Sequence, residues 1–185
     1  MKLILASNSP RRKQLLEDAG YKFDIIVGDY DEKAFTDNPV ITAKTFSLGK
    51  AQATFAILKD KNVLVLGADT VVYYNGKILG KAKTEKEAFE TLSELSGKTH
   101  KVITGYALVG EFGKKQGYVE TEVKFNKLSK KLINEYIESG LYKGKAGSYG
   151  IQDGFPLVKC YKGSLNNVIG LPIETLKPII DELMK

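Results

Sequence analysis

Two arginines stand at the start of a predicted helix, the end at which cations are ordinarily disfavoured. In LILASNSPRRKQLL, residues 3–16, an apolar run leads into Ser7 and Ser9, and a proline precedes Arg11 and Arg12. The helix dipole repels cations at this end, whereas backbone N–H groups and forked guanidinium donors there bind phosphate well. We therefore expect the two serines and two arginines to form an anion site. The alternative is a capped surface helix with two solvated arginines.

A carboxylate inside an apolar stretch is the second candidate. In VLVLGADTVVYY, residues 63–74, strand-forming apolar residues flank Asp69 on both sides. Burial of an unpaired carboxylate is costly, so we expect a metal ion or a basic partner beside it. The alternative is an aspartate at a strand end that only caps a turn. Asp31 and Glu32 could add oxygen ligands, which suit Mg²⁺ or Mn²⁺ better than zinc, unless this acidic turn is simply solvated.

Three lysines and a glutamine complete the candidate set. Lys50 lies close to the apolar side of a predicted helix and Lys81 follows the strand-like ILG; both could reach a bound anion or merely extend to solvent. Lys145 and Gln152 lie in KGKAGSYGIQDG, where small residues permit a ligand to approach the backbone. A primary amide donates and accepts hydrogen bonds, so Gln152 could read a base edge. The alternative is a flexible surface loop.

The only histidine and the only cysteine do not suggest a reactive centre. His100 begins a predicted strand with no serine motif beside it, and Cys160 alternates with its neighbours as strand residues do. We expect structural roles for both. One cysteine excludes an internal disulfide, and the two residues cannot make a multi-ligand Cys/His zinc site. Neither GxxxxGK[ST] nor GxGxxG occurs in the sequence, which excludes the common nucleotide-binding loops.

Length and composition fit one folded domain over residues 1–185. The formal net charge of +6 favours anionic partners and leaves nucleic acid and small phosphorylated molecules open. The longest apolar runs are too short to span a bilayer, and the N-terminus lacks the long apolar segment of a signal peptide. We therefore expect a cytoplasmic protein without membrane contact.

Strands and helices alternate in the predicted element order, which indicates an α/β protein with a mixed sheet. Strand patterns occur at residues 2–6, 23–27, 63–74, 77–79, 100–109, 116–125 and 155–161, and residues 67–69 are expected to break the stretch 63–74. Helical patterns occur at residues 10–19, 41–59, 84–95 and 129–139 and at the C-terminus, where Pro178 predicts a kink or a late start. A capping box of Thr84 and Glu87 begins the third helix, and Ser9 is the expected N-cap of the first.

Six motifs follow one another along essentially the whole chain: ASNSPRR, LGADTVV, LGK at residues 79–81, LSGKTHKVITG, KAGSYGIQ and GSLNNVIGLP. Together they resemble the Maf family, also called septum formation inhibitor proteins. The resemblance implies a metal-dependent nucleoside triphosphate pyrophosphatase, which cuts between the α and β phosphates and releases a nucleoside monophosphate and pyrophosphate. It also implies the α/β fold of inosine triphosphate pyrophosphatases, an elongated mixed sheet with a cleft between two lobes, often as a homodimer.

The resemblance also assigns roles to residues. Asp69 matches the family's proton acceptor. Arg12, Thr70 and Gln152 are similar to the branch that acts on dTTP and UTP, rather than the branch that handles 7-methyl-GTP. Two residues depart from the family pattern: Ala82 replaces a common proline, and Asp153 replaces a common glycine and adds a negative charge near the expected base pocket.

We expect the triphosphate to lie across residues 7–12 while a water oriented by Asp69 attacks the α phosphorus and pyrophosphate leaves. Charge neutralisation would carry most of the catalysis. The ammonium groups expected on the phosphate oxygens are those of Lys50, Lys81 and Lys145. The oxygen ligands expected for Mg²⁺ or Mn²⁺ are those of Asp69 and Glu32, with Asp31 as an alternative.

Two other functions stay open on sequence alone. The basic balance would suit a nucleic-acid-binding or division-regulating protein without catalysis, although the lysines are interspersed with acids and no basic tail or RNP-like motif is present. The other is a pyrophosphatase for modified purine nucleotides.

Overall fold

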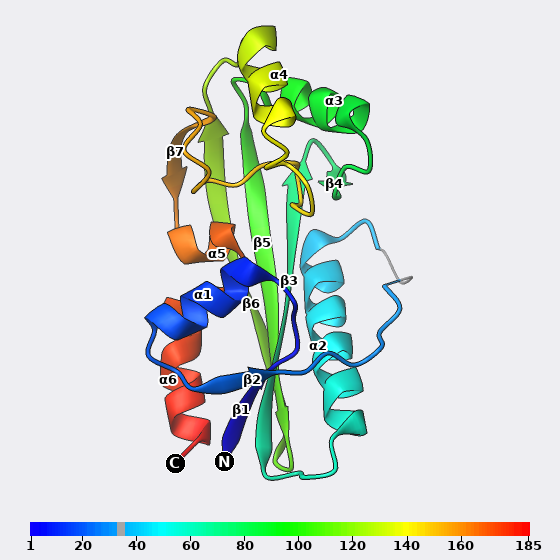
Figure 1. Ribbon diagram of the computed structural model, residues 1–185, viewed down its shortest axis with the longest axis vertical. Helices are drawn as coiled ribbons and strands as arrows, with labels where there is room; N and C mark the ends of the chain where they lie inside the picture. The colour runs from blue at the N-terminus through cyan, green and yellow to red at the C-terminus, as the bar shows by residue number, and fades with distance from the viewer. Residues whose placement is uncertain (33–35) are drawn as a thin grey trace.

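The computed structural model describes residues 1–32 and 36–185, and in this part of the chain a seven-stranded mixed sheet carries helices on both faces (Figure 1). The strand order is β2-β1-β3-β5-β6-β7, and β4 pairs with β3 off this path. The strands are β1 (Lys2–Leu5), β2 (Phe23–Ile25), β3 (Val63–Tyr74), β4 (Lys77–Leu79), β5 (Thr99–Gly110), β6 (Gly113–Phe125) and β7 (Val158–Lys162). The helices are α1 (Pro10–Asp18), α2 (Pro39–Ile57), α3 (Glu85–Leu95), α4 (Lys130–Glu138), α5 (Leu165–Ile169) and α6 (Ile173–Leu183).

Three long antiparallel strands form the spine of an elongated molecule. β3, β5 and β6 have 12, 12 and 13 residues and run through most of its length (Figure 1). β3 and β5 are almost entirely buried because helices cover both faces, which explains their nearly continuous apolar sequences. In β6, residues 120–125 alternate exposed and buried, as expected of a strand with one face toward solvent.

Helix α2 covers one face of β3 and β5, and two glycines set how closely it approaches. A Cβ at Gly67 would lie 2.2 Å from the carbonyl oxygen of Ser47, and one at Gly105 would lie 2.3 Å from that of Ala43. These distances are far below van der Waals contact, so the helix backbone packs directly on the strand backbones. The close approach brings the side chain of Lys50 to the surface of β3.

The opposite face of the same strands is covered by α1 and α6. Leu16 of α1 and Leu176 and Ile180 of α6 are fully buried against alternate residues of β1, β3 and β5. In Figure 1, these two helices lie to the left of the long strands and α2 lies to the right.

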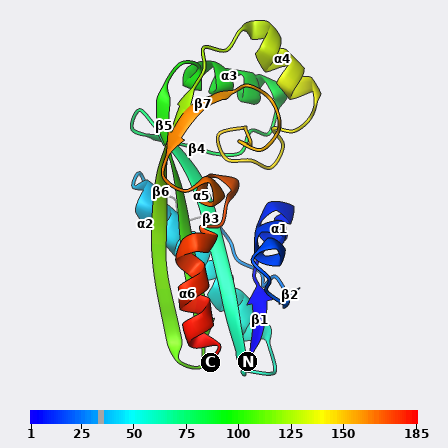
Figure 2. The same ribbon diagram turned by 90° about the vertical axis from the view of Figure 1, so that its left-hand side faces the viewer.

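A second hydrophobic core lies toward the other end of the long strands. Helices α3 and α4 and the irregular segment 139–157 pack there around Leu92, Phe125 and Tyr136. Figure 2 shows α3, α4 and β7 gathered at the top of the molecule, with α1, α2 and α6 below. The two groups of helices are thus two lobes on one continuous sheet.

Between the two lobes, one edge of β3 changes its pairing partner from β1 to β4. β1 pairs in parallel with β3 from Val63 to Leu66, and β4 pairs antiparallel with it from Val72 to Tyr74. In the described residues neither ladder covers the intervening stretch 67–71. Other parts of the chain can therefore reach this edge, and both Asp69 and Thr70 lie on it.

The predicted α/β class and the mixed, helix-flanked sheet are confirmed. The strand-rich stretch predicted at residues 63–74 is the single strand β3, so the break expected at residues 67–69 was wrong: these residues continue the ladder with β5 without interruption. The strand predicted at residues 77–79 has the observed bounds of β4. Pro178 lies inside α6, which begins at Ile173, so a late start of this helix was a wrong expectation. Among the described helices, none combines the length and apolar character needed to cross a membrane.

The observed helix caps agree only in part with the caps predicted from the sequence. The Thr84 hydroxyl accepts from the N–H of Glu87, but the Glu87 carboxylate accepts from the N–H of Lys83 rather than closing the expected box on Thr84. Ser9 occupies the N-cap of α1 without a side-chain capping hydrogen bond. The N–H of Ser9 instead donates to the Ser7 hydroxyl, 3.2 Å away.

Candidate active site

Asp69 is a buried carboxylate with a basic partner, as its apolar surroundings predict. Asp69 is only 8% exposed, and Lys50 Nζ of α2 donates to Asp69 Oδ1 at 2.5 Å. The same ammonium lies 2.6 Å from Glu32 Oε1. Lys50 therefore joins two carboxylates that are far apart in sequence, one from the middle of β3 and one from the loop that follows β2.

The pKa of the Glu32 carboxylate is lowered by nearby cations. Burial by itself would raise the pKa of Glu32, but the hydrogen bond and charge of Lys50, with smaller contributions from Lys81 and Arg12, hold it below its ordinary value. The group is thus ionised at neutral pH beside the Asp69–Lys50 pair.

Arg12 is a brace that ties three segments together at the start of α1. Its Nε donates to the Gly170 carbonyl at 2.8 Å, and its two terminal nitrogens donate to the Ser7 and Thr70 hydroxyls at 3.1 and 3.2 Å. Thr70 Oγ1 also shares a hydrogen bond with Thr104 Oγ1, 2.9 Å away. Burial lowers the pKa of Arg12 from its ordinary value, with Asp69 acting in the opposite direction.

The far wall of the site comes from the glycine-rich segment. Lys145 and Asp153 form an ion pair whose side chains are only 8% and 6% exposed. Tyr149 packs beside them, 5% exposed, and Gln152 is exposed at the rim. An isolated β-bridge between Lys81 and Ala146 holds the strand end after β4 against this segment.

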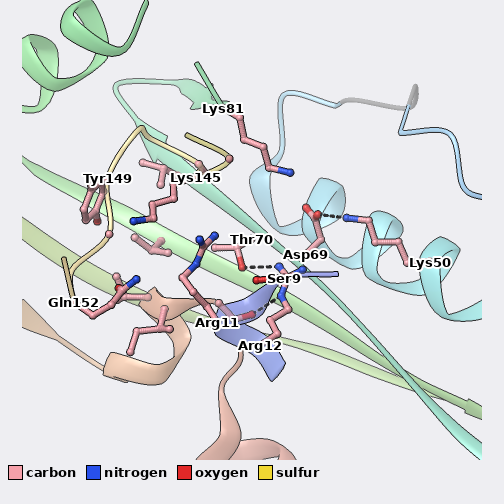
Figure 3. A pocket seen from close by; sticks show the side chains of 18 residues that line it. Ser9, Arg11, Arg12, Lys50, Asp69, Thr70, Lys81, Lys145, Tyr149 and Gln152 are labelled. Carbon is pink, nitrogen blue, oxygen red and sulfur yellow. Dashed lines mark hydrogen bonds and ion pairs between the residues drawn. The ribbon is translucent and has the colours of Figure 1, made fainter. Parts of the chain in front are cut away.

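These residues enclose one pocket between the two lobes (Figure 3). Its charged lining consists of five cationic side chains and one carboxylate, which suits a polyanion held beside a single acid. The lining residues are Ser9, Arg11, Arg12, Lys50, Asp69, Thr70, Val72, Lys81, Val102, Gly144, Lys145, Ala146, Tyr149, Gly150, Gln152, Val168, Ile169 and Gly170.

Most of the predicted site residues line this pocket, and three of them do not. Ser7 braces Arg12 from outside the lining, and Glu32 contacts the site through Lys50. Asp31 is exposed beside Glu32 and does not line the pocket. In the described part of the chain, no group of three or more His, Cys, Asp or Glu side chains is placed to hold a metal ion.

His100 and Cys160 lie outside the lining. His100 is 2% exposed, its Nε2 is 2.7 Å from the Tyr149 hydroxyl, and burial lowers its pKa to about 4. Cys160 is exposed on β7. Sequence reasoning missed Tyr149, although it stands in the same glycine-rich run as Gln152, and it missed Gly170, whose carbonyl accepts a hydrogen bond from Arg12.

A comparison with known families supports the geometry. The family profile described as "Maf-like protein" matches residues 2–183. The chain belongs to the Maf family. Relatives in this family include a Clostridium tetani protein named dTTP/UTP pyrophosphatase, 40% identical over 99% of this chain and 98% of its own length. A Bacillus thuringiensis protein of the same name is 44% identical over 95% of this chain and 92% of its own length.

Among solved structures, the chain is similar to the Staphylococcus aureus Ham1 protein. The match has a TM-score of 0.49 and 12% identity, and it covers 69% of this chain and 73% of that one.

Proposed function

We propose that this Maf family member hydrolyses dTTP and UTP to the nucleoside monophosphate and pyrophosphate, with residues 1–185 acting as one catalytic domain. The observation that carries the proposal is a buried carboxylate, Asp69, facing a pocket lined by five cations. Relatives that share 40% or more of their residues with this chain bear the name of this activity.

The reaction needs a base and compensation for phosphate charge. Asp69 orients a water and accepts its proton as the water oxygen bonds to the α phosphorus, while the bond to the bridging oxygen breaks and pyrophosphate leaves. Arg11 and Lys81 lie on the wall and neutralise phosphate oxygens. Lys50, bonded to Asp69 Oδ1, fixes the direction of that carboxylate.

A divalent metal ion fits the donor set. Glu32 and Asp69 both direct a carboxylate oxygen at one ammonium, 2.6 and 2.5 Å away, so this position already attracts a cation between hard oxygen ligands. We propose that these two residues hold Mg²⁺ or Mn²⁺, with Asp31 as the alternative ligand. When bound, the ion would add positive charge for phosphate oxygens and make a coordinated water more acidic.

Base selection is assigned to residues in the middle of the pocket and at its rim. Arg12 fixes Thr70 by a hydrogen bond, and Gln152 presents an amide at the rim. We propose that these three residues select a pyrimidine base. A homodimeric, cytoplasmic protein completes the proposal, and sedimentation of the full chain tests the oligomeric state.

Product analysis tests the reaction. The protein is incubated with ordinary and modified nucleoside triphosphates, including purines, with Mg²⁺ or Mn²⁺. The expected products from UTP and dTTP are the monophosphate and pyrophosphate in equal amounts. Release of orthophosphate with a diphosphate would point to a different hydrolase, and preference for modified purines would overturn the assigned substrate.

A further inference from the structure

The ion pair of Lys145 and Asp153 is more deeply buried than a surface salt bridge and is held from behind. The Tyr136 hydroxyl of α4 donates to Asp153 Oδ2 at 2.6 Å, and the N–H of Gly150 donates to that hydroxyl at 3.1 Å. Tyr136 itself is fully buried in the core. The carboxylate of Asp153 is therefore held in place by Tyr136 of α4, and the carboxylate in turn holds the ammonium of Lys145.

Lys145 lies at the end of the pocket away from the reacting groups. In Figure 3, Lys145, Tyr149 and Gln152 are gathered at the left, whereas Asp69 and Lys50 lie at the right, with Thr70 and Arg12 between them. Valine side chains and the Tyr149 ring line this pocket as well, and they can contact the flat faces of a base.

Asp153 compensates the charge of Lys145, so this ammonium is poorly suited to neutralise phosphate. An ammonium has three N–H donors. Within the described residues, its hydrogen-bond acceptor is the Asp153 carboxylate, and Lys145 also lines the pocket. A ligand acceptor at this end would meet a positioned, desolvated donor.

We propose that Lys145 is a specificity-determining residue that donates to the C4 carbonyl of a uracil or thymine base, and that Asp153 is the residue that positions it. This inference rests on the proposed function, because it concerns the base of the same substrate. Cytosine carries an amino group at C4, and two donors facing each other would leave the buried ammonium unsatisfied. A site built to bond a substrate group discriminates strongly against an analogue that lacks it.

Binding of non-hydrolysable analogues tests the inference separately from catalysis. Calorimetry gives the Kd of α,β-imido-UTP and α,β-imido-CTP for the wild-type protein and for Asp153→Asn and Lys145→Gln. We expect the wild type to prefer the uridine analogue. Each substitution should reduce the ratio of the Kd of the cytidine analogue to the Kd of the uridine analogue about tenfold. Most of this change should come from weaker binding of the uridine analogue. Asp153→Glu should restore part of the preference.

A matched control and a milder variant separate this role from general loss of structure. Glu120→Gln removes a carboxylate from the exposed Lys101–Glu120 pair and should leave the ratio unchanged. Tyr136→Phe keeps both charges of the buried pair but removes the hydroxyl that holds Asp153, so the ratio should fall about two- to threefold. If Asp153→Asn does not fold, Tyr136→Phe decides.

Equal weakening of both analogues, an unchanged ratio in the folded variants, or no preference in the wild type would overturn the inference. A wild type that prefers the uridine analogue but releases no pyrophosphate from UTP would refute the proposed reaction and leave this inference standing.

Discussion

At the scale of single residues, the site depends on charges that are shared rather than free. Lys50 contacts both Glu32 and Asp69, and Arg12 contacts Ser7, Thr70 and Gly170. Removal of one member therefore leaves the others with unmatched polar groups in a buried environment, which costs more than the lost contact alone.

Asp69→Asn should reduce turnover of UTP about a thousandfold, which corresponds to roughly 4 kcal/mol of activation free energy. The amide keeps the shape of the side chain but cannot accept a proton from water. Steady-state pyrophosphate release measures the effect, and circular dichroism checks the fold. Wild-type turnover by the folded variant would remove Asp69 from the role of base.

Arg12→Lys should lower both activity and stability although the charge is kept. A lysine carries its N–H donors on one nitrogen and cannot reproduce the planar fork of three nitrogens, so some of the three acceptors, the Gly170 carbonyl and the two hydroxyls, lose their partner. We expect a loss of about 1–3 kcal/mol in the free energy of unfolding, measured by urea denaturation. Lys13→Arg, a reverse exchange at the next, solvent-exposed residue of α1, is the control and should have little effect. Equal stability of Arg12→Lys and the wild type would contradict the bracing role.

At the scale of elements, pattern and pairing decide what the sequence predicts. β5 and α2 were predicted with nearly the observed bounds because their apolar residues follow a strand and a helical pattern over many residues. The five-residue α5 was missed because it is too short to show a helical period, although Ser164 caps it. β6 begins at Gly113 rather than residue 116 because its ladder with β5 continues up to the turn. The strand predicted at 155–161 pairs with β6 only from Val158.

Candidate site residues were predictable as motifs, but their pairings were not. Asp69 stood out because a carboxylate interrupts an apolar strand, and it does lie in the pocket. The partner of Lys145 is Asp153. From the sequence, Asp153 was interpreted only as a departure from the family pattern that adds a negative charge near the base pocket. Such a pairing depends on where α4 places Tyr136, and no local pattern carries that information.

Gly105→Ala tests the close packing of α2 on the sheet. The added Cβ would lie 2.3 Å from the Ala43 carbonyl oxygen, so the helix must shift. We expect a loss of about 1–3 kcal/mol in the free energy of unfolding and a fall in turnover, since Lys50 moves with α2. Gly80→Ala, where a Cβ meets no atom within 4 Å, is the stability control. A fully stable Gly105→Ala protein would show that the packing is looser than described.

At the scale of the whole molecule, His100 couples stability to pH. The folded pKa of about 4 lies below the ordinary value of 6.5, so the unfolded chain binds the extra proton first. The contribution of the neutral ring is complete above pH 6.5 and is lost as the pH falls toward 4, by roughly 3 kcal/mol in total.

Urea denaturation between pH 7 and pH 4 measures this dependence. His100→Gln has no titrating ring and should show a shallower decline over the same range. Identical slopes for the two proteins would contradict the assignment. Glu32 contributes in a separate window: because its folded pKa is lowered, its stabilisation is lost at more acidic pH, as the carboxylate becomes protonated.

The three unbroken strands also have a mechanical consequence. β3, β5 and β6 pass through both lobes, and β3 itself carries Asp69 at the crossing point. Squeezing the lobes together would require bending all three ladders at once, whereas a hinged pair of domains would need only a linker to rotate. Substrate entry should therefore rely on local rearrangement of side chains and loops rather than on closure of the lobes.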